Sequence, residues 1–149
     1  MMATNLLNES IARQVQEVFE QLHEPVQVLF FGKKDGCDYC ADTLQLVEEV
    51  VSLSDKLELS VYDMELDADL ARRYNVDKAP CLVLAGRDGD QIMDFGVRYA
   101  GIPAGHEFSS LIHDLVLVSG RDSGLSQTTR GFLRGLTSPV RLQVFVTPT

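Results

Sequence analysis

"FFGKKDGCDYCADTLQLVEEVV", residues 30–51, holds two cysteines three positions apart, Cys37 and Cys40. They stand where an apolar run ends and a pattern typical of a helix begins, with Leu44 and Val47 at helical spacing. A cysteine pair in this place has three interpretations: a redox pair, half of a metal site, or two small core residues. The surrounding sequence must decide among them.

The composition is that of a soluble globular domain. The chain has 149 residues, 45% hydrophobic and 23% charged, enough for one domain with its own core. No apolar run is long enough to span a bilayer and no signal peptide is visible, so we expect a cytoplasmic protein without membrane contact. The formal net charge of −9 argues against a nucleic-acid partner, which requires a basic surface.

Hydrophobic periodicity predicts alternating helices and strands. Apolar residues at steps of three and four predict helices, and short β-branched or alternating runs predict strands. The predicted helices are residues 4–24, 38–54, 67–75 and 104–119, and the predicted strands are residues 26–31, 57–63, 81–86 and 91–98.

This order predicts an α/β fold with a central mixed four-stranded sheet and helices on both faces. Strands 26–31 and 57–63 are joined through a helix and should run parallel. The "RDGD" turn at residues 87–90 predicts an antiparallel hairpin, because Asp-Gly tolerates positive φ.

The last 30 residues differ from the rest. Residues 1–119 form the predicted domain, and residues 120–149 read as a linker helix followed by a strand at 140–146. "SPVRLQVFVTPT" from residue 138 resembles "EPVQVLFFGKKDGC" from residue 24, so we interpret it as the first strand of a truncated second unit. An unpaired strand exposes backbone groups, so we expect it to pack on the first unit or to form a homo-oligomer.

The spacing of the two cysteines suits dithiol exchange. Residues at i and i+3 share a helix face, with Cβ atoms about 5–6 Å apart. Cys40 continues the apolar stripe of Leu44 and Val47 and should point inward, whereas Cys37 should be exposed. An exposed thiolate that attacks a disulfide and a buried thiol that resolves the intermediate are what exchange requires.

The charges around the pair predict a moderate thiol pKa and a fairly reducing pair. A helix N-terminus favours the thiolate by about 0.3–1 kcal/mol. Lys33 and Lys34 act in the same direction, and Asp35 and Asp38 oppose them. A zinc site remains an alternative, but it needs four ligands, and no histidine stands at paired ligand spacing. Two inert core cysteines remain the other alternative.

The strand, the Cys-Asp-Tyr-Cys that opens a helix, and "KAPCLVL" at residues 78–84 together resemble the thioredoxin superfamily. The resemblance implies that Pro80 is the cis-proline that faces the cysteine pair in that superfamily. Ala79 would then offer its backbone to a substrate chain. Tyr39 would lie on the exposed surface that a substrate touches, and we read Cys81 as a core residue rather than a disulfide sensor.

A closer resemblance is to the glutaredoxin-like protein disulfide oxidoreductases, which contain two fused thioredoxin-fold units. "VLFFGKKDGCDYC", "KAPCLVL" and "RYAGIPAGHEF" carry it. It implies that this chain is the N-terminal unit, with Cys37 as nucleophile and Cys40 as resolving thiol. We expect protein disulfides as substrates, a flavoprotein reductase as electron donor, and no organic cofactor or metal. Glutathione-linked activity, an electron relay like that of alkyl hydroperoxide reductase flavoproteins, and a non-catalytic docking role remain alternatives.

Overall fold

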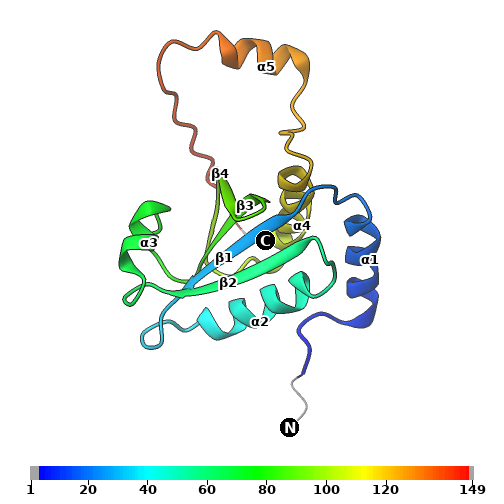
Figure 1. Ribbon diagram of the computed structural model, residues 1–149, viewed down its shortest axis with the longest axis vertical. Coiled ribbons are helices and arrows are strands. Elements are labelled where there is room, and N and C mark those ends of the chain that lie inside the picture. Colours follow the sequence, from blue (N-terminus) through cyan, green and yellow to red (C-terminus); the bar gives the residue numbers. More distant parts are fainter. Residues whose placement is uncertain (1–3, 148–149) are drawn as a thin grey trace.

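A four-stranded sheet organises the structure, a computed structural model that describes residues 4–147. The strands are β1 Val26–Gly32, β2 Leu57–Asp63, β3 Cys81–Asp88 and β4 Gln91–Ala100. Their order across the sheet is β2-β1-β3-β4. Strand β1 pairs parallel with β2, and β3 pairs antiparallel with both β1 and β4. The predicted mixed sheet is therefore confirmed (Figure 1).

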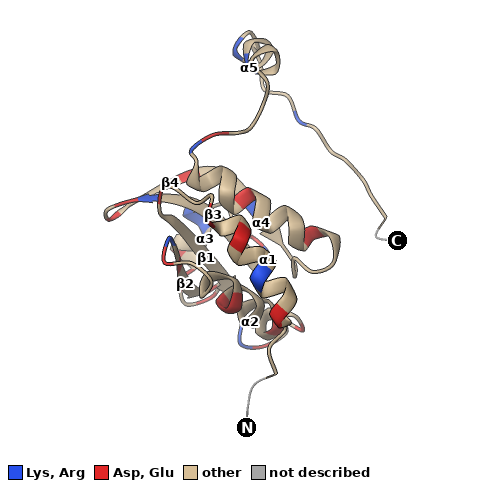
Figure 2. Ribbon diagram, turned by 90° about the vertical axis from the view of Figure 1, so that its right-hand side faces the viewer, with Lys and Arg blue, Asp and Glu red and all other residues tan. Residues whose placement is uncertain are grey.

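Within the described residues five helices surround or follow the sheet: α1 Glu9–Phe19, α2 Cys40–Val51, α3 Ala68–Arg73, α4 His106–Ser119 and α5 Gln127–Arg134. Buried side chains of α1, α2 and α4 share one cluster with β1 and β3, which we call the main core. A second core on the other sheet face takes its helical part from α3 and the turn after it. In Figure 2 α1 and α4 lie toward the viewer and α3 lies on the far side.

Strand β1 is buried along its whole length because both of its faces are covered. Val26, Val28 and Phe30 enter the main core, while Leu29 and Phe31 enter the second core. This alternation follows from the two-residue period of a strand. It explains why the sequence shows a continuous apolar run there instead of alternating polar residues.

Helix α1 is shorter than the predicted helix at 4–24. The side chain of Asn8 accepts a hydrogen bond from the Ile11 amide at 2.9 Å. Asn8 is therefore the N-cap, and the helix begins at Glu9. The residues before it are held by α2 instead. The Glu49 carboxylate accepts hydrogen bonds from the amides of Leu6 at 2.9 Å and Leu7 at 2.8 Å.

We predict that Glu49→Ala frees this N-terminal segment. Burial alone would raise the pKa of Glu49, but hydrogen bonds from Leu7, Leu6 and Gln45 outweigh it and hold the pKa below its ordinary value of 4.5. A lowered pKa means that the contact is complete above pH 4.5 and is lost as the pH falls through the folded-state value. Protection of the Leu6 and Leu7 amides from hydrogen exchange at neutral pH should fall by about 5-fold or more.

The matched control for this prediction is Glu48→Ala, one position away on an exposed part of α2. It should leave the exchange of Leu6 and Leu7 unchanged. Equal loss of protection in the two variants would show that helix α2, and not the Glu49 carboxylate, orders the segment.

The C-terminal part departs from the rest of the molecule. A helix, α5, forms where the sequence predicts one, and it stands apart from the sheet in both views (Figures 1 and 2). The following segment is extended but pairs with no strand among residues 4–147. Its apolar side chains are 63% to 89% exposed, namely Val140, Leu142, Val144, Phe145 and Val146.

Residues 140–146 form no strand within residues 4–147 and do not pack on the first unit, so of the two expected arrangements only pairing with another molecule is left. A strand requires backbone partners, which this segment lacks here. Its assignment to a second unit, the domain division at residue 119 and its pairing with another molecule stay predictions. No helix within residues 4–147 has the length and apolar character to cross a bilayer.

Candidate functional site

Cys37 and Cys40 form a disulfide at the carboxyl end of β1. Strand β1 ends at Gly32, residues 33–39 form a loop, and α2 begins at Cys40. The Cα atoms of the two cysteines are 5.5 Å apart, within the range that a disulfide spans. Helix α2 thus starts two residues later than the helix predicted at 38–54, and Cys37 lies in the loop before it.

The two cysteines differ in exposure, as the sequence predicts. Cys40 is 7% exposed and belongs to the main core. Cys37 is half-buried and packs against the edge of that core. Tyr39, between them, is 59% exposed. A partner molecule can therefore reach Cys37 and Tyr39 from the solvent, whereas the Cys40 side chain is covered by the protein.

Two features of the backbone hold Cys40 in place. The Lys33 amide donates a hydrogen bond to Cys40 Sγ at 3.4 Å, which ties the sulfur to the end of β1. A Cβ at residue 32 would lie 2.6 Å from the Phe30 ring and 3.6 Å from Cys40 Sγ. Glycine at position 32 therefore lets the ring and the sulfur pack closely. The sequence offered no signal for the Lys33 contact, because it depends on the path of the loop.

The start of α2 adds a modest positive potential near the pair. The Tyr39 carbonyl accepts from the Thr43 amide at 3.0 Å and from Thr43 Oγ1 at 2.6 Å, which closes the first turn. Tyr39 provides no side-chain cap, and Asp42 lies in the first turn. The potential of a helix end is worth about 0.3–1 kcal/mol and falls off within one turn. The carboxylate of Asp42 opposes this potential.

Pro80 lies beside the cysteine pair and its bond to Ala79 is cis, as the resemblance implied. In the antiparallel register Cys81 pairs with Phe31, which places Pro80 next to the end of β1. Pro80 is buried, and its carbonyl accepts from the Gly101 amide at 2.9 Å. Ala79 is half-buried and packs against the same core as Cys37. The structure thus brings Cys37, Cys40, Ala79 and Pro80 to one end of the sheet.

Cys81 lies on the other face of the sheet. It belongs to the second core, and its Sγ donates to the Leu82 carbonyl at 3.7 Å. Burial raises the pKa of the Cys81 thiol above its ordinary value. The sheet separates it from the buried Cys40, so the prediction that Cys81 is a core residue is confirmed.

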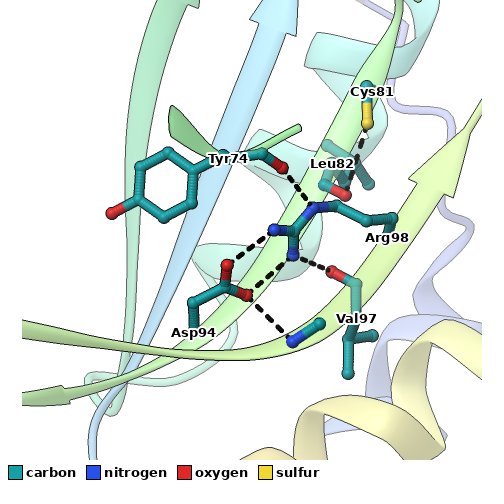
Figure 3. A network of polar contacts seen from close by, with 7 residues as sticks. Tyr74, Cys81, Leu82, Asp94, Val97 and Arg98 are labelled. Carbon is teal, nitrogen blue, oxygen red and sulfur yellow. Dashed lines mark hydrogen bonds and ion pairs between the residues drawn. The ribbon is translucent and has the colours of Figure 1, made fainter. Parts of the chain in front are cut away.

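An arginine network closes the second core near Cys81 (Figure 3). Arg98 donates to the Tyr74 carbonyl at 2.9 Å and to both Asp94 oxygens at 2.8 and 2.7 Å. The Arg98 guanidinium also lies 5.9 Å from the centre of the Tyr74 ring. The hydrogen bond from Arg98 holds the pKa of Asp94 below its ordinary value. These contacts join α3 to β4 and have a structural role.

The site supports thiol chemistry. Among residues 4–147 no three His, Cys, Asp or Glu side chains gather closely enough to hold a metal ion. A half-buried and a buried cysteine in one disulfide can accept two electrons and return them. The arrangement is therefore that of a reversible dithiol–disulfide pair.

Known proteins share this arrangement of fold and sequence. No protein-family model matches the chain. It is 28% identical to the alkyl hydroperoxide reductase protein AhpF of Pseudomonas aeruginosa over 140 residues, 94% of this chain and 24% of that protein. It is also 32% identical to a Bacillus subtilis protein named NADH dehydrogenase over 122 residues, 82% of this chain and 20% of the other.

Two solved structures give further matches. A protein disulfide oxidoreductase from Aeropyrum pernix K1 superposes with a TM-score of 0.74 and 31% identity, covering 87% of this chain and 55% of that one. The AhpF protein of Enterococcus faecalis superposes with a TM-score of 0.76 and 24% identity, covering 87% and 61%. The second match supports the fold alone.

The fold and the cysteine pair define a thiol–disulfide oxidoreductase-like domain of the thioredoxin superfamily. Its homologues are the N-terminal domain of AhpF and a protein disulfide oxidoreductase. The chain spans about a quarter of the length of the AhpF relatives, at 24% and 25%.

Proposed function

We propose that this domain exchanges disulfides with protein partners through Cys37 and Cys40. The observation that carries the proposal is the unequal exposure of the two cysteines within one disulfide at the end of β1. Cys37 is the attacking thiol because a partner can reach it. Cys40 is the resolving thiol because it is buried against the main core and faces Cys37.

The exchange proceeds in two steps with balanced electrons. The Cys37 thiolate attacks one sulfur of a partner disulfide, forms a mixed disulfide and displaces a partner thiolate. Cys40 then attacks Cys37 Sγ as a thiolate, restores the internal disulfide and displaces the second partner thiolate. Two electrons pass to the partner, and the two protons of the dithiol end on its thiols. A dithiol donor or a flavoprotein reductase must reduce the pair again.

Three further residues form the substrate contact in this proposal. Tyr39 supplies exposed aromatic surface next to Cys37. Pro80 shapes the backbone at Ala79, whose polar groups can pair with an extended partner chain, since β-addition uses free main-chain groups. The half-buried position of Ala79 beside the core that Cys37 contacts supports this role.

A trapping experiment tests the order of attack. Cys40→Ser leaves the first step intact and removes the second, so mixed disulfides with a protein substrate should accumulate. Cys37→Ser should accumulate none, because Cys40 is buried. The adducts are counted by mass spectrometry after acid quenching. Equal trapping by the two variants would remove the assignment of roles.

An electron relay is the second candidate. The similarity to the alkyl hydroperoxide reductase protein AhpF, which extends over 94% of this chain, favours it. In this role a flavoprotein reduces the Cys37–Cys40 pair, which passes electrons to a second redox protein. We place the domain in the cytoplasm, where such reductants keep dithiols reduced. Pairing of two copies through the exposed C-terminal segment belongs to the same proposal.

A further inference from the structure

A hollow of about 160 Å³ lies beside the redox site, lined by Lys34, Asp35, Asp63, Glu65 and Leu66. It forms between the loop before Cys37 and the turn that connects β2 to α3. The two segments meet because parallel β1 and β2 end at the same side of the sheet (Figure 1). A hydrogen bond from the Met64 amide to the Gly32 carbonyl at 2.9 Å joins them.

Leu66 is 80% exposed at the rim of this hollow. Hydrogen bonds within the turn fix the position of Leu66. Asp63 Oδ1 accepts from the amides of Glu65 at 2.8 Å and Leu66 at 3.1 Å. Asp67 Oδ2 accepts from the Asp63 amide at 2.9 Å, and the Asp67 amide donates to the Asp63 carbonyl at 2.8 Å. These bonds hold the turn at residues 63–67 in one conformation, so a partner that binds Leu66 does not have to order it.

The charges around the hollow are unequal. Three carboxylates, those of Asp35, Asp63 and Glu65, line it together with one ammonium group, that of Lys34. Asp63 is engaged by its own turn, whereas Asp35 and Glu65 are exposed. Lys33 is also close enough to act on Asp63, so the carboxylates outnumber the ammonium groups by one and the net charge around the hollow is negative. Complementary charge at the rim of an interface steers the encounter and selects the partner.

We propose that the turn at residues 63–67 is a docking contact for the polypeptide that brings its disulfide to Cys37. The docked segment carries an apolar side chain that packs on Leu66 and a Lys or Arg side chain that lies near Asp35 and Glu65. This inference rests on the proposed disulfide exchange and adds the chemistry of the partner. Asp35, which lines the hollow, is two positions before Cys37, so a segment bound there lies on the loop that carries the attacking sulfur.

The test uses the full chain and three disulfide substrates. Two are synthetic peptide disulfides that differ only in whether two Arg or two Glu residues flank a Leu beside the cysteine. The third is 2-hydroxyethyl disulfide, which is too small to reach the hollow and Cys37 together. We expect the wild-type chain to reduce the Arg peptide with a kcat/KM about 5- to 20-fold above that of the Glu peptide, a preference that falls with added salt.

Leu66→Ser should lower kcat/KM for the Arg peptide by about 5- to 20-fold, as truncation of an interface anchor does. It should leave the rate with 2-hydroxyethyl disulfide within a factor of about two. Glu65→Lys should remove the preference for the Arg peptide. The matched control is Leu125→Ser, which changes an exposed leucine of the linker after α4 and should alter none of the three rates.

Three results would overturn the inference. One is equal rates of the wild-type chain with the Arg and Glu peptides. Another is an unchanged Arg-peptide rate in Leu66→Ser. The third is a parallel loss with 2-hydroxyethyl disulfide, which would show that Leu66 acts on the reaction or the fold. Failure of the disulfide exchange itself would appear separately, as no reduction of 2-hydroxyethyl disulfide by the wild-type chain.

Discussion

Cys37→Ser is expected to lower the rate of disulfide reduction by roughly 10³-fold or more. The attacking species is a thiolate, and a serine hydroxyl in the same place does not ionise near neutral pH. Cys40 cannot take over, because it is 7% exposed and lies within the main core. The measurement is turnover of a protein disulfide such as insulin with the reduced domain in catalytic amount.

The same assay separates the candidate roles by its electron donor. Turnover with a flavoprotein reductase and not with glutathione supports protein disulfide exchange or the relay. Turnover with glutathione alone supports the glutaredoxin-like alternative. If neither donor gives turnover above that of free dithiol, the result supports the non-catalytic docking role. The control is Cys81→Ala, which changes a thiol on the opposite face of the sheet and should keep the wild-type rate within a factor of about two.

Leu82→Ala is expected to lower the free energy of unfolding by about 2–5 kcal/mol. Leu82 is 0% exposed and packs in the main core with Phe30, Leu84 and Cys40. Removing its side chain leaves a cavity that strand β3, held between β1 and β4, cannot close by moving. The measurement is urea unfolding of wild type and variant, both with the Cys37–Cys40 disulfide intact.

The matched control is Leu142→Ala, the same substitution at a leucine that is 86% exposed in the C-terminal segment. Its unfolding free energy should stay within about 0.5 kcal/mol of wild type. A loss for Leu82→Ala that is no larger than this would mean that β3 does not lie at the centre of the core.

Local pattern was sufficient for most of the fold. The strand predicted at 57–63 agrees with β2 residue for residue, because alternation of polar and apolar residues reports a half-buried strand directly. The parallel pairing of β1 and β2 followed from the helix between them, and the hairpin from Asp-Gly. The cysteine pair and its unequal exposure were visible for the same reason, since each depends on residues near in the chain. The place of Pro80 was implied by the resemblance to the thioredoxin superfamily and not by local pattern.

What the sequence determined alone is therefore the element order, the mixed sheet, the unequal cysteines and the exposed Tyr39. Only the tertiary structure decided that Cys37 precedes α2, that Lys33 donates to Cys40 and that Cys81 faces the second core. It also decided that the turn at residues 63–67 stands beside the redox loop. Periodicity reports which way a side chain points relative to its own element, whereas these contacts depend on how separate loops and strands meet across the sheet.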